Sequence, residues 1–145
     1  MTGELDQHYM RLAINLARKA EGQTSPNPIV GAVVVKSGKV VAGGYHKKAG
    51  FPHAEIVALR KAGSKARGAD LYVNLEPCCH YGSTPPCTEA IITAGIKRVV
   101  IGIRDPNHLV SGKGMRFLKK KGIEVVTGIL KRDCEKLNES FLKYI

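Results

Sequence analysis

The chain has 145 residues, and its 23 Lys and Arg against 12 Asp and Glu give a formal net charge of +11 at pH 7. This length suits one compact domain over residues 1–145, and the 43% hydrophobic and 24% charged residues exclude a disordered or fibrous chain. The first ten residues lack the basic region of a signal peptide, and no apolar run approaches the roughly 18 residues of a membrane span, so we expect a soluble, cytoplasmic protein without a membrane partner.

The first third of the chain reads as a helix followed by a hairpin. Apolar residues at helical spacing predict a helix over residues 5–20, with Leu5, Tyr9, Leu12, Leu16 and Ala20 as its apolar stripe. A polar loop with glycine and proline follows over residues 21–28. Two runs rich in β-branched residues, 29–35 and 40–45, flank a turn sequence and predict an antiparallel hairpin. Gly43 and Gly44 weaken its second strand, which is typical of an edge strand or a bulge.

Helices and strands alternate through the rest of the chain. We predict helices over residues 53–62, 86–94, 114–121 and 130–144, and strands over residues 71–75, 97–103 and 123–126. A hairpin followed by alternating strands and helices indicates an α/β fold, with a mixed five-stranded sheet inside a three-layer α/β/α sandwich. Each later strand then leads into a helix at the same edge of the sheet, which is where such folds place their sites.

Cysteines cluster in one segment of the sequence. Cys78, Cys79 and Cys87 lie within ten residues, and Cys134 stands apart in the last predicted helix. Four cysteines are too few for a disulfide framework, and a reducing cytoplasm would not maintain one. The cluster therefore indicates metal binding or catalysis, and Cys134 is most simply a core residue.

Two motifs in chain order suggest a zinc site. His53-Ala54-Glu55 opens a predicted helix, and a Pro-Cys pair ending in Cys78 precedes Cys87 by nine positions. This order matches the layout of zinc-dependent deaminases. One imidazole and two thiolates supply the three ligands of a catalytic zinc and leave a fourth position for water, so we predict His53, Cys78 and Cys87 as ligands of Zn²⁺. A structural zinc site, or a coincidence of motifs without zinc, is the alternative reading.

The remaining polar residues of these motifs receive separate interpretations. Glu55, two residues after a ligand, is poorly placed to bind the metal but can reach over it as a proton shuttle. The peptide between Cys78 and Cys79 is stiff, and adjacent cysteines do not easily direct both sulfurs at one metal, so Cys79 is expected beside the site or simply buried. His80 is either a neighbour of the site or a structural histidine.

Beyond these motifs, the sequence resembles one family over nearly its whole length: the deaminase domain of the bifunctional deaminase/reductase of riboflavin biosynthesis, with a cytidine deaminase-like fold. The resemblance rests on segments that include Asn27-Pro28, His53-Ala54-Glu55, the Leu75–Cys78 segment, Thr84-Pro85-Pro86-Cys87 and Arg104–Asn107. The long Cys-x8-Cys spacing is its most specific part, because most other zinc deaminases separate the two cysteines by two residues.

The resemblance implies a reaction and a set of site residues. It implies hydrolytic deamination of 2,5-diamino-6-ribosylamino-4(3H)-pyrimidinone 5′-phosphate, a phosphorylated pyrimidine, to 5-amino-6-ribosylamino-2,4(1H,3H)-pyrimidinedione 5′-phosphate and ammonia. By the same resemblance, His53, Cys78 and Cys87 hold zinc, and Glu55 is the catalytic proton shuttle. Asn27 and His46 are implied as contacts to the pyrimidine, and Asp105 and Asn107 as residues near the ribose phosphate.

The chain departs from the family pattern in two places. The family continues into a reductase domain that this chain lacks, so the next step is expected from a separate reductase or from a missing segment. Ser83 stands where relatives often carry Lys or Arg, which leaves open how the substrate phosphate is bound. The apolar C-terminal helix could also serve as an interface in a homo-oligomer.

Two other functions remain as alternatives. The positive charge would suit a tRNA adenosine deaminase, but the Cys-x8-Cys spacing and the absence of Trp speak against a nucleic-acid substrate. A zinc-binding interaction module without catalysis is the other alternative.

Overall fold

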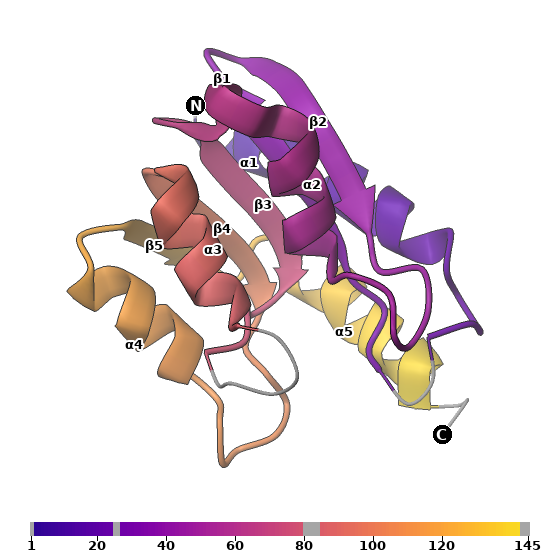
Figure 1. Ribbon diagram of the computed structural model, residues 1–145. Helices are drawn as coiled ribbons and strands as arrows, with labels where there is room; N and C mark the ends of the chain where they lie inside the picture. Colours follow the sequence, from indigo (N-terminus) through magenta and orange to yellow (C-terminus); the bar gives the residue numbers. More distant parts are fainter. Residues whose placement is uncertain (1, 25–26, 80–84, 143–145) are drawn as a thin grey trace.

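The computed structural model describes residues 2–24, 27–79 and 85–142, and it has five helices, five strands and one short 3-10 helix in those ranges. Figure 1 shows a twisted sheet with helices on both of its faces. In chain order the elements are α1 (Thr2–Arg18), β1 (Gly31–Lys36), β2 (Lys39–Tyr45), α2 (Ala54–Ala62), η1 (Gly63–Ala66), β3 (Asp70–Leu75), α3 (Cys87–Ala94), β4 (Arg98–Ile103), α4 (Lys113–Lys120), β5 (Glu124–Thr127) and α5 (Lys131–Leu142). The predicted α/β class is confirmed, and η1 is the element that the sequence pattern did not predict.

The sheet is mixed, as predicted. Its strand order is β2-β1-β3-β4-β5. Strand β1 pairs antiparallel with both β2 and β3, whereas β3, β4 and β5 are parallel to one another. The carboxyl ends of the three parallel strands therefore meet at one edge, from which the chain leads into α3, α4 and α5.

The protein has two hydrophobic cores, one between each face of the sheet and the helices that cover it. One core packs α2, α3 and α4 against one face of the sheet, through residues such as Leu59, Ile91 and Leu118. The other packs α1 and α5 against the opposite face, through residues such as Met10 and Leu137. Figure 1 shows this division, with α2, α3 and α4 in front of the sheet and α1 and α5 behind it. Side chains alternate between the faces of each strand, so the central strands are buried on both sides.

The hairpin β1–β2 confirms the predicted turn and explains its glycines. Ser37 and Gly38 both have positive φ, as a tight two-residue hairpin turn requires. Strand β2 lies at the edge of the sheet, and the pairing register shifts between Val34 and Val35. A Cβ at Gly44 would lie 2.7 Å from the Val57 side chain, so this glycine lets α2 pack closely on the edge strand.

Strand β1 begins later than the predicted residue 29 because a side chain replaces its first ladder bonds. Asn74 of β3 accepts a hydrogen bond from the Gly31 amide at 2.8 Å and donates one to the Ile29 carbonyl at 2.9 Å. At the same place a Cβ on Gly31 would meet the backbone of α1 at the Ala13 carbonyl. Asn74 thus holds the segment that enters the sheet, and Gly31 allows α1 to lie directly on it.

The predicted apolar stripe of α1 is wrong in part. Leu5 is 55% exposed, whereas Met10 and the nearby Ala13 and Ile14 are fully buried, so the helix is rotated relative to the predicted face. An ion pair explains the rotation. Asp6 turns inward and accepts a hydrogen bond from Arg98 of β4 at 2.6 Å, which brings the adjacent Leu5 to the surface.

Candidate metal centre

Three residues of the type that binds zinc lie together at the carboxyl edge of the sheet. The ligand atoms of His53, Cys78 and Cys87 all lie within 4.8 Å of one another. His53 directly precedes α2, Cys78 follows β3, and Cys87 is the first residue of α3. The fold therefore brings together the two motifs that are separated in the sequence.

Local backbone chemistry places each of these residues. His53 is the N-cap of α2, with extended φ −65° and ψ 156°, and Pro86 is the corresponding N-cap of α3. Both helices start one residue later than predicted, so His53 lies outside its helix and Cys87 begins the next one. The Thr88 amide donates to the Cys78 carbonyl at 3.1 Å, which ties the start of α3 to the end of β3.

The donor set fits zinc. The Nδ1 atom of His53 lies 3.2 Å from Sγ of Cys87, and the Cys87 amide donates to Sγ of Cys78 at 3.4 Å. A tetrahedral zinc with Zn–S near ~2.3 Å and Zn–N near ~2.0 Å separates its ligand atoms by roughly 3.5–3.8 Å. The 3.2 Å between Nδ1 of His53 and Sγ of Cys87 is close to this separation, and one imidazole and two thiols leave a fourth position for water or substrate.

Hydrogen bonding divides the two thiols unequally in the metal-free protein. The Cys87 thiol donates to the Cys78 sulfur, and together with His53 and the Cys87 amide this lowers the pKa of Cys78 to about 4. The same hydrogen bond, with burial, raises the pKa of Cys87. The shared proton therefore stays on Cys87, and the thiolate of the metal-free protein lies at Cys78. The thiolate also raises the pKa of His53, mainly through a hydrogen bond between the two side chains.

Glu55 is buried beside this cluster. It lies in the first turn of α2 and is only 4% exposed. Burial raises the pKa of its carboxyl group to about 7, and the nearby Cys78 thiolate acts in the same direction. A carboxyl group with such a pKa can both take up and release a proton near neutral pH.

A second polar pair, Asn27 and His46, lies next to the metal ligand His53. His46, only 2% exposed, has its Nε2 atom 3.1 Å from Nδ2 of Asn27 and its Nδ1 atom 3.1 Å from the carbonyl of Pro52. A carbonyl accepts and an amide nitrogen donates, so Nδ1 carries the proton and the ring is neutral. Burial lowers the pKa of His46, which agrees with this state. The ring also stacks edge-on against His53, with 5.4 Å between the ring centroids.

Asp105 and Asn107 lie in the segment between β4 and α4. Each side chain accepts a hydrogen bond from a backbone amide two residues later, at 2.9 Å from Asn107 and 3.0 Å from Leu109. The structure does not bring these two residues into the cleft that contains His53, and their predicted contact with substrate stays a prediction.

Sequence reasoning gave no role to Glu76, which holds this same segment. Its carboxylate is 5% exposed and accepts hydrogen bonds from the amides of Asp105, Gly112 and Met115 at 2.9–3.1 Å. The available signal was an acidic residue at the end of an apolar strand, directly before Pro77. A buried carboxylate at such a place needs several donors, but the sequence does not say which ones.

Two of the three predicted metal ligands, His53 and Cys87, line a cleft of about 840 Å³ between α2 and α3. Asn27, Phe51, His53 and Cys87 line it, together with apolar residues of the two helices such as Ile56. This volume lies within the range of small-molecule sites. The cleft thus connects the predicted zinc ligands with one of the predicted substrate contacts.

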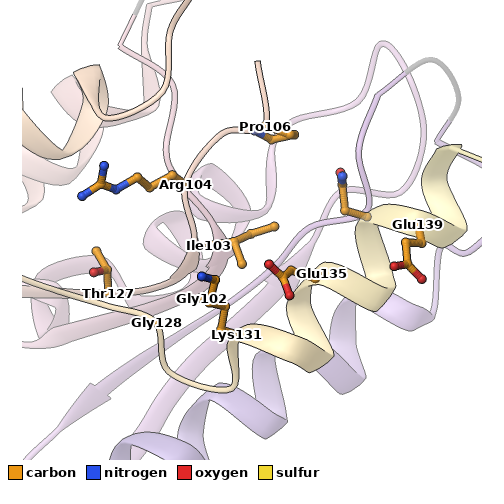
Figure 2. Close-up of a pocket in the computed structure, with 10 residues that line it drawn as sticks. Gly102, Ile103, Arg104, Pro106, Thr127, Gly128, Lys131, Glu135 and Glu139 are labelled. Atoms are coloured by element: carbon orange, nitrogen blue, oxygen red, sulfur yellow. The ribbon is translucent and has the colours of Figure 1, made fainter. Parts of the chain in front are cut away.

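Figure 2 shows a second cavity, of about 820 Å³, at the carboxyl ends of β4 and β5. Arg104, Lys131, Glu135 and Glu139 surround it, and α5 forms one wall. None of the predicted site residues lines this cavity. The chemistry of the three ligands therefore belongs to the first cleft.

The other sequence interpretations have different outcomes. Cys134 of α5 is 1% exposed and belongs to the core between this helix and the sheet, as predicted. Cys79 is half-buried and does not belong to the group of three ligand residues. His80 and Ser83 lie outside the described residues.

The protein family follows from this site and from the sequence around it. Residues 3–103 match the family described as "Cytidine and deoxycytidylate deaminase zinc-binding region". The chain belongs to this family of zinc-dependent deaminases. The predicted metal, zinc, is therefore confirmed, with His53, Cys78 and Cys87 as its site.

Within that family, the chain is similar to the deaminase part of RibD. It is 59% identical over 145 residues to the riboflavin biosynthesis protein RibD of Aquifex aeolicus, covering 100% of this chain and 41% of the relative. It is 52% identical to the diaminohydroxyphosphoribosylamino-pyrimidine deaminase of Buchnera aphidicola, covering 95% of this chain and 94% of that protein. The structure superposes on RibD of Acinetobacter baumannii with a TM-score of 0.95 at 52% identity, over 99% of this chain and 40% of that one.

The chain spans about two fifths of the length of the RibD relatives that it matches. A Thermotoga maritima relative, 49% identical with a TM-score of 0.92, is described as a deaminase and reductase, and this chain covers 42% of it. The relatives come from bacteria and also include chloroplastic plant proteins. In the described ranges, no helix has the length and apolar character needed to cross a membrane.

Proposed function

We propose that this chain hydrolytically deaminates 2,5-diamino-6-ribosylamino-4(3H)-pyrimidinone 5′-phosphate, releasing ammonia. The observation that carries the proposal is the cluster of His53, Cys78 and Cys87 beside the buried carboxyl group of Glu55. The match over 94% of the Buchnera deaminase supports the substrate, because that relative is named for this pyrimidine.

The reaction replaces an amino group on a ring carbon with an oxygen from water. Zinc, when bound by His53, Cys78 and Cys87, supplies a Lewis acid that makes a water molecule more acidic. Glu55 takes a proton from the attacking water on a carboxylate oxygen and delivers it to the ring nitrogen next to the reacting carbon. It then transfers the second proton to the leaving amine, so that water is consumed and ammonia released in equal amounts. The pKa near 7 suits a group that must accept and donate within one cycle.

Other residues orient the substrate in this proposal. Asn27 and His46 contact the pyrimidine, and the hydrogen bond between them sets the direction of the Asn27 amide. Asp105 and Asn107 contact the ribose phosphate side from the segment after β4. The partner in this proposal is a small-molecule substrate. The cytoplasmic location of the protein and its assembly into a homo-oligomer stay predictions from the sequence.

We further propose that residues 1–145 act as one deaminase unit. The reductive step that follows is then supplied by a separate polypeptide or by the rest of a longer chain. Adding a reductase and NADPH to the purified deaminase tests this arrangement. The reductase should consume the pyrimidinedione that the deaminase releases.

Ammonia release from the pyrimidine phosphate by the zinc-loaded protein tests the main proposal. We expect turnover by the unmodified protein and a loss of at least about 100-fold in Glu55→Gln, with zinc content and fold retained. Glu4→Gln, the same change on the exposed side of α1, is the matched control. Full turnover in Glu55→Gln would contradict the mechanism, and turnover of a tRNA adenosine instead of the pyrimidine would contradict the substrate.

A further inference from the structure

The carboxylate of Glu76 joins two parts of the candidate site. It lies two residues before the zinc ligand Cys78, at the carboxyl end of β3. Its side chain extends to the next junction of the sheet, where β4 leads into α4. Its own amide donates to the Ile103 carbonyl at 3.0 Å, so backbone and side chain both bind the end of β4.

Three amides converge on this one side chain. One oxygen, Oε1, accepts from Asp105 at 2.9 Å and from Gly112 at 3.0 Å, and Oε2 accepts from Met115 at 3.1 Å. The first donor starts the segment after β4, and the other two belong to the start of α4. Amides at a helix start have no partner inside the helix, so the carboxylate satisfies donors that would otherwise be buried without one.

The start of α4 packs closely against the end of β3 at this place. Glu76 is 5% exposed, and Gly114, between two of the donors, has no side chain where a Cβ would meet the carbonyl of Pro77. The start of α4 therefore rests directly on the residue between Glu76 and Cys78.

The segment held in this way borders the ligand side of the sheet. Open α/β sheets bind their ligands outside the carboxyl ends of the strands, and the segment between β4 and α4 follows such an end, next to the one that carries Cys78. It presents Asp105, the exposed Asn107 and the 69% exposed Leu109. The three hydrogen bonds to Glu76 connect both ends of this segment to the end of β3, the strand that leads to Cys78. Among the side-chain hydrogen bonds of the described residues, no others do so.

We propose that Glu76 is a positioning residue that sets the distance between the zinc ligands and segment 104–112, which the proposed function places at the ribose phosphate, and thereby the affinity for substrate. This inference rests on the proposed function. Glu76 contacts neither the substrate nor the metal, and it acts through the backbone of the segment. Such a residue contributes equally to binding of the ground state and of the transition state, so its loss raises KM more than it lowers kcat.

Glu76→Gln and Glu76→Ala test the proposal as a graded pair in the zinc-loaded protein. The Gln side chain keeps one carbonyl oxygen for Asp105 and Gly112 but turns an NH2 group toward the Met115 amide. The Ala side chain removes all three acceptors. We expect KM to rise several-fold in Glu76→Gln and about tenfold or more in Glu76→Ala, with kcat within about threefold and zinc content unchanged.

Amide hydrogen exchange gives a readout independent of activity. The amides of Asp105, Gly112 and Met115 should exchange faster in the variants, beginning with Met115 in Glu76→Gln, while those of β3 and β4 keep their rates. Glu4→Gln is the matched control for both measurements. Glu76→Gln carries the test if Glu76→Ala does not fold.

The outcomes separate this inference from the proposed function. Faster exchange with a raised KM supports the positioning role, and faster exchange with unchanged KM overturns it. Unchanged exchange overturns it as well, because the segment is then held by something else. If the unmodified protein does not release ammonia from the pyrimidine, the proposed function fails, and the positioning role in that reaction fails with it. If the protein is active but KM is unchanged in the Glu76 variants, only the positioning role is overturned.

Discussion

Asn27 donates a hydrogen bond from Nδ2 to Nε2 of His46 across 3.1 Å, although the two residues come from separate loops on either side of the β1–β2 hairpin. On its other side, the His46 ring donates a hydrogen bond from Nδ1 to the carbonyl of Pro52, the residue before the zinc ligand His53. A buried neutral imidazole thus lies between a candidate substrate contact and the metal ligand. The orientation of each depends on the other two.

Asn27→Asp should raise the pKa of His46. In the native protein burial lowers this pKa, whereas a carboxylate facing Nε2 would favour the imidazolium form. NMR titration of the His46 ring measures the change. An unchanged pKa would contradict the contact between Asn27 and His46.

The same contact should also appear in turnover. We expect Asn27→Ala to lower kcat/KM for the pyrimidine by about 10–100-fold, which is typical of residues that orient a metal site or its ligand, with zinc content retained. Gln7→Ala, on the exposed side of α1, is the control. Unchanged kcat/KM in Asn27→Ala would remove Asn27 from the substrate contacts.

Removal of zinc should expose one cysteine to alkylation. Because the pKa of Cys78 is lowered to about 4 and that of Cys87 is raised, Cys78 is the thiolate of the metal-free protein at pH 5.5, where an ordinary thiol is almost entirely protonated. Treatment with iodoacetamide after chelation should therefore modify Cys78 before Cys79, Cys87 or Cys134, as read by peptide mass spectrometry. Added zinc should suppress the reaction, and modification of Cys87 first would contradict the proton assignment.

Acid should weaken the protein partly through Asp6. Burial alone raises the pKa of this carboxyl group, but hydrogen bonds from Arg98 and Tyr72 and the charge of Arg98 outweigh it, so the pKa is lowered in the folded state. A lowered carboxyl pKa contributes stability above the unfolded pKa of about 3.9 and loses it as pH falls through the folded pKa. Denaturant unfolding between pH 2 and about pH 5 should therefore show a smaller loss of stability in Asp6→Asn than in the native protein.

Arg98→Met tests the same ion pair from its other side. It leaves Asp6 buried without its charged partner, which costs about 3–5 kcal/mol of unfolding free energy for a buried pair. The exposed pair between Arg11 and Asp133 is the control, since its side chains are 46% and 32% exposed. Asp133→Asn should change the unfolding free energy by less than about 1 kcal/mol. Equal effects of the two changes would mean that burial does not strengthen the Asp6 pair.

The sequence predicted the fold class because its signals are local. Hydrophobic periodicity, β-branched runs and glycine or proline breakers identify elements within windows of ten to twenty residues. The hairpin turn at Ser37 and Gly38 and the alternation that follows it were enough to predict a mixed sheet between helices. The ligand types and their order predicted zinc at His53, Cys78 and Cys87, because few side chains bind that metal.

The tertiary structure alone decided how these elements and side chains pair. Asp6 and Arg98 are 92 positions apart, so no local pattern showed that Asp6 turns inward and exposes Leu5. Likewise, no window contains both Glu76 and the amides that it binds, 29 to 39 positions away. Cys78 and Cys87 can share a proton only because the fold brings the end of β3 close to the start of α3. Residue type and spacing determine which chemistry a chain can carry, whereas burial and long-range hydrogen bonds, which arise only on folding, decide which atom holds each charge.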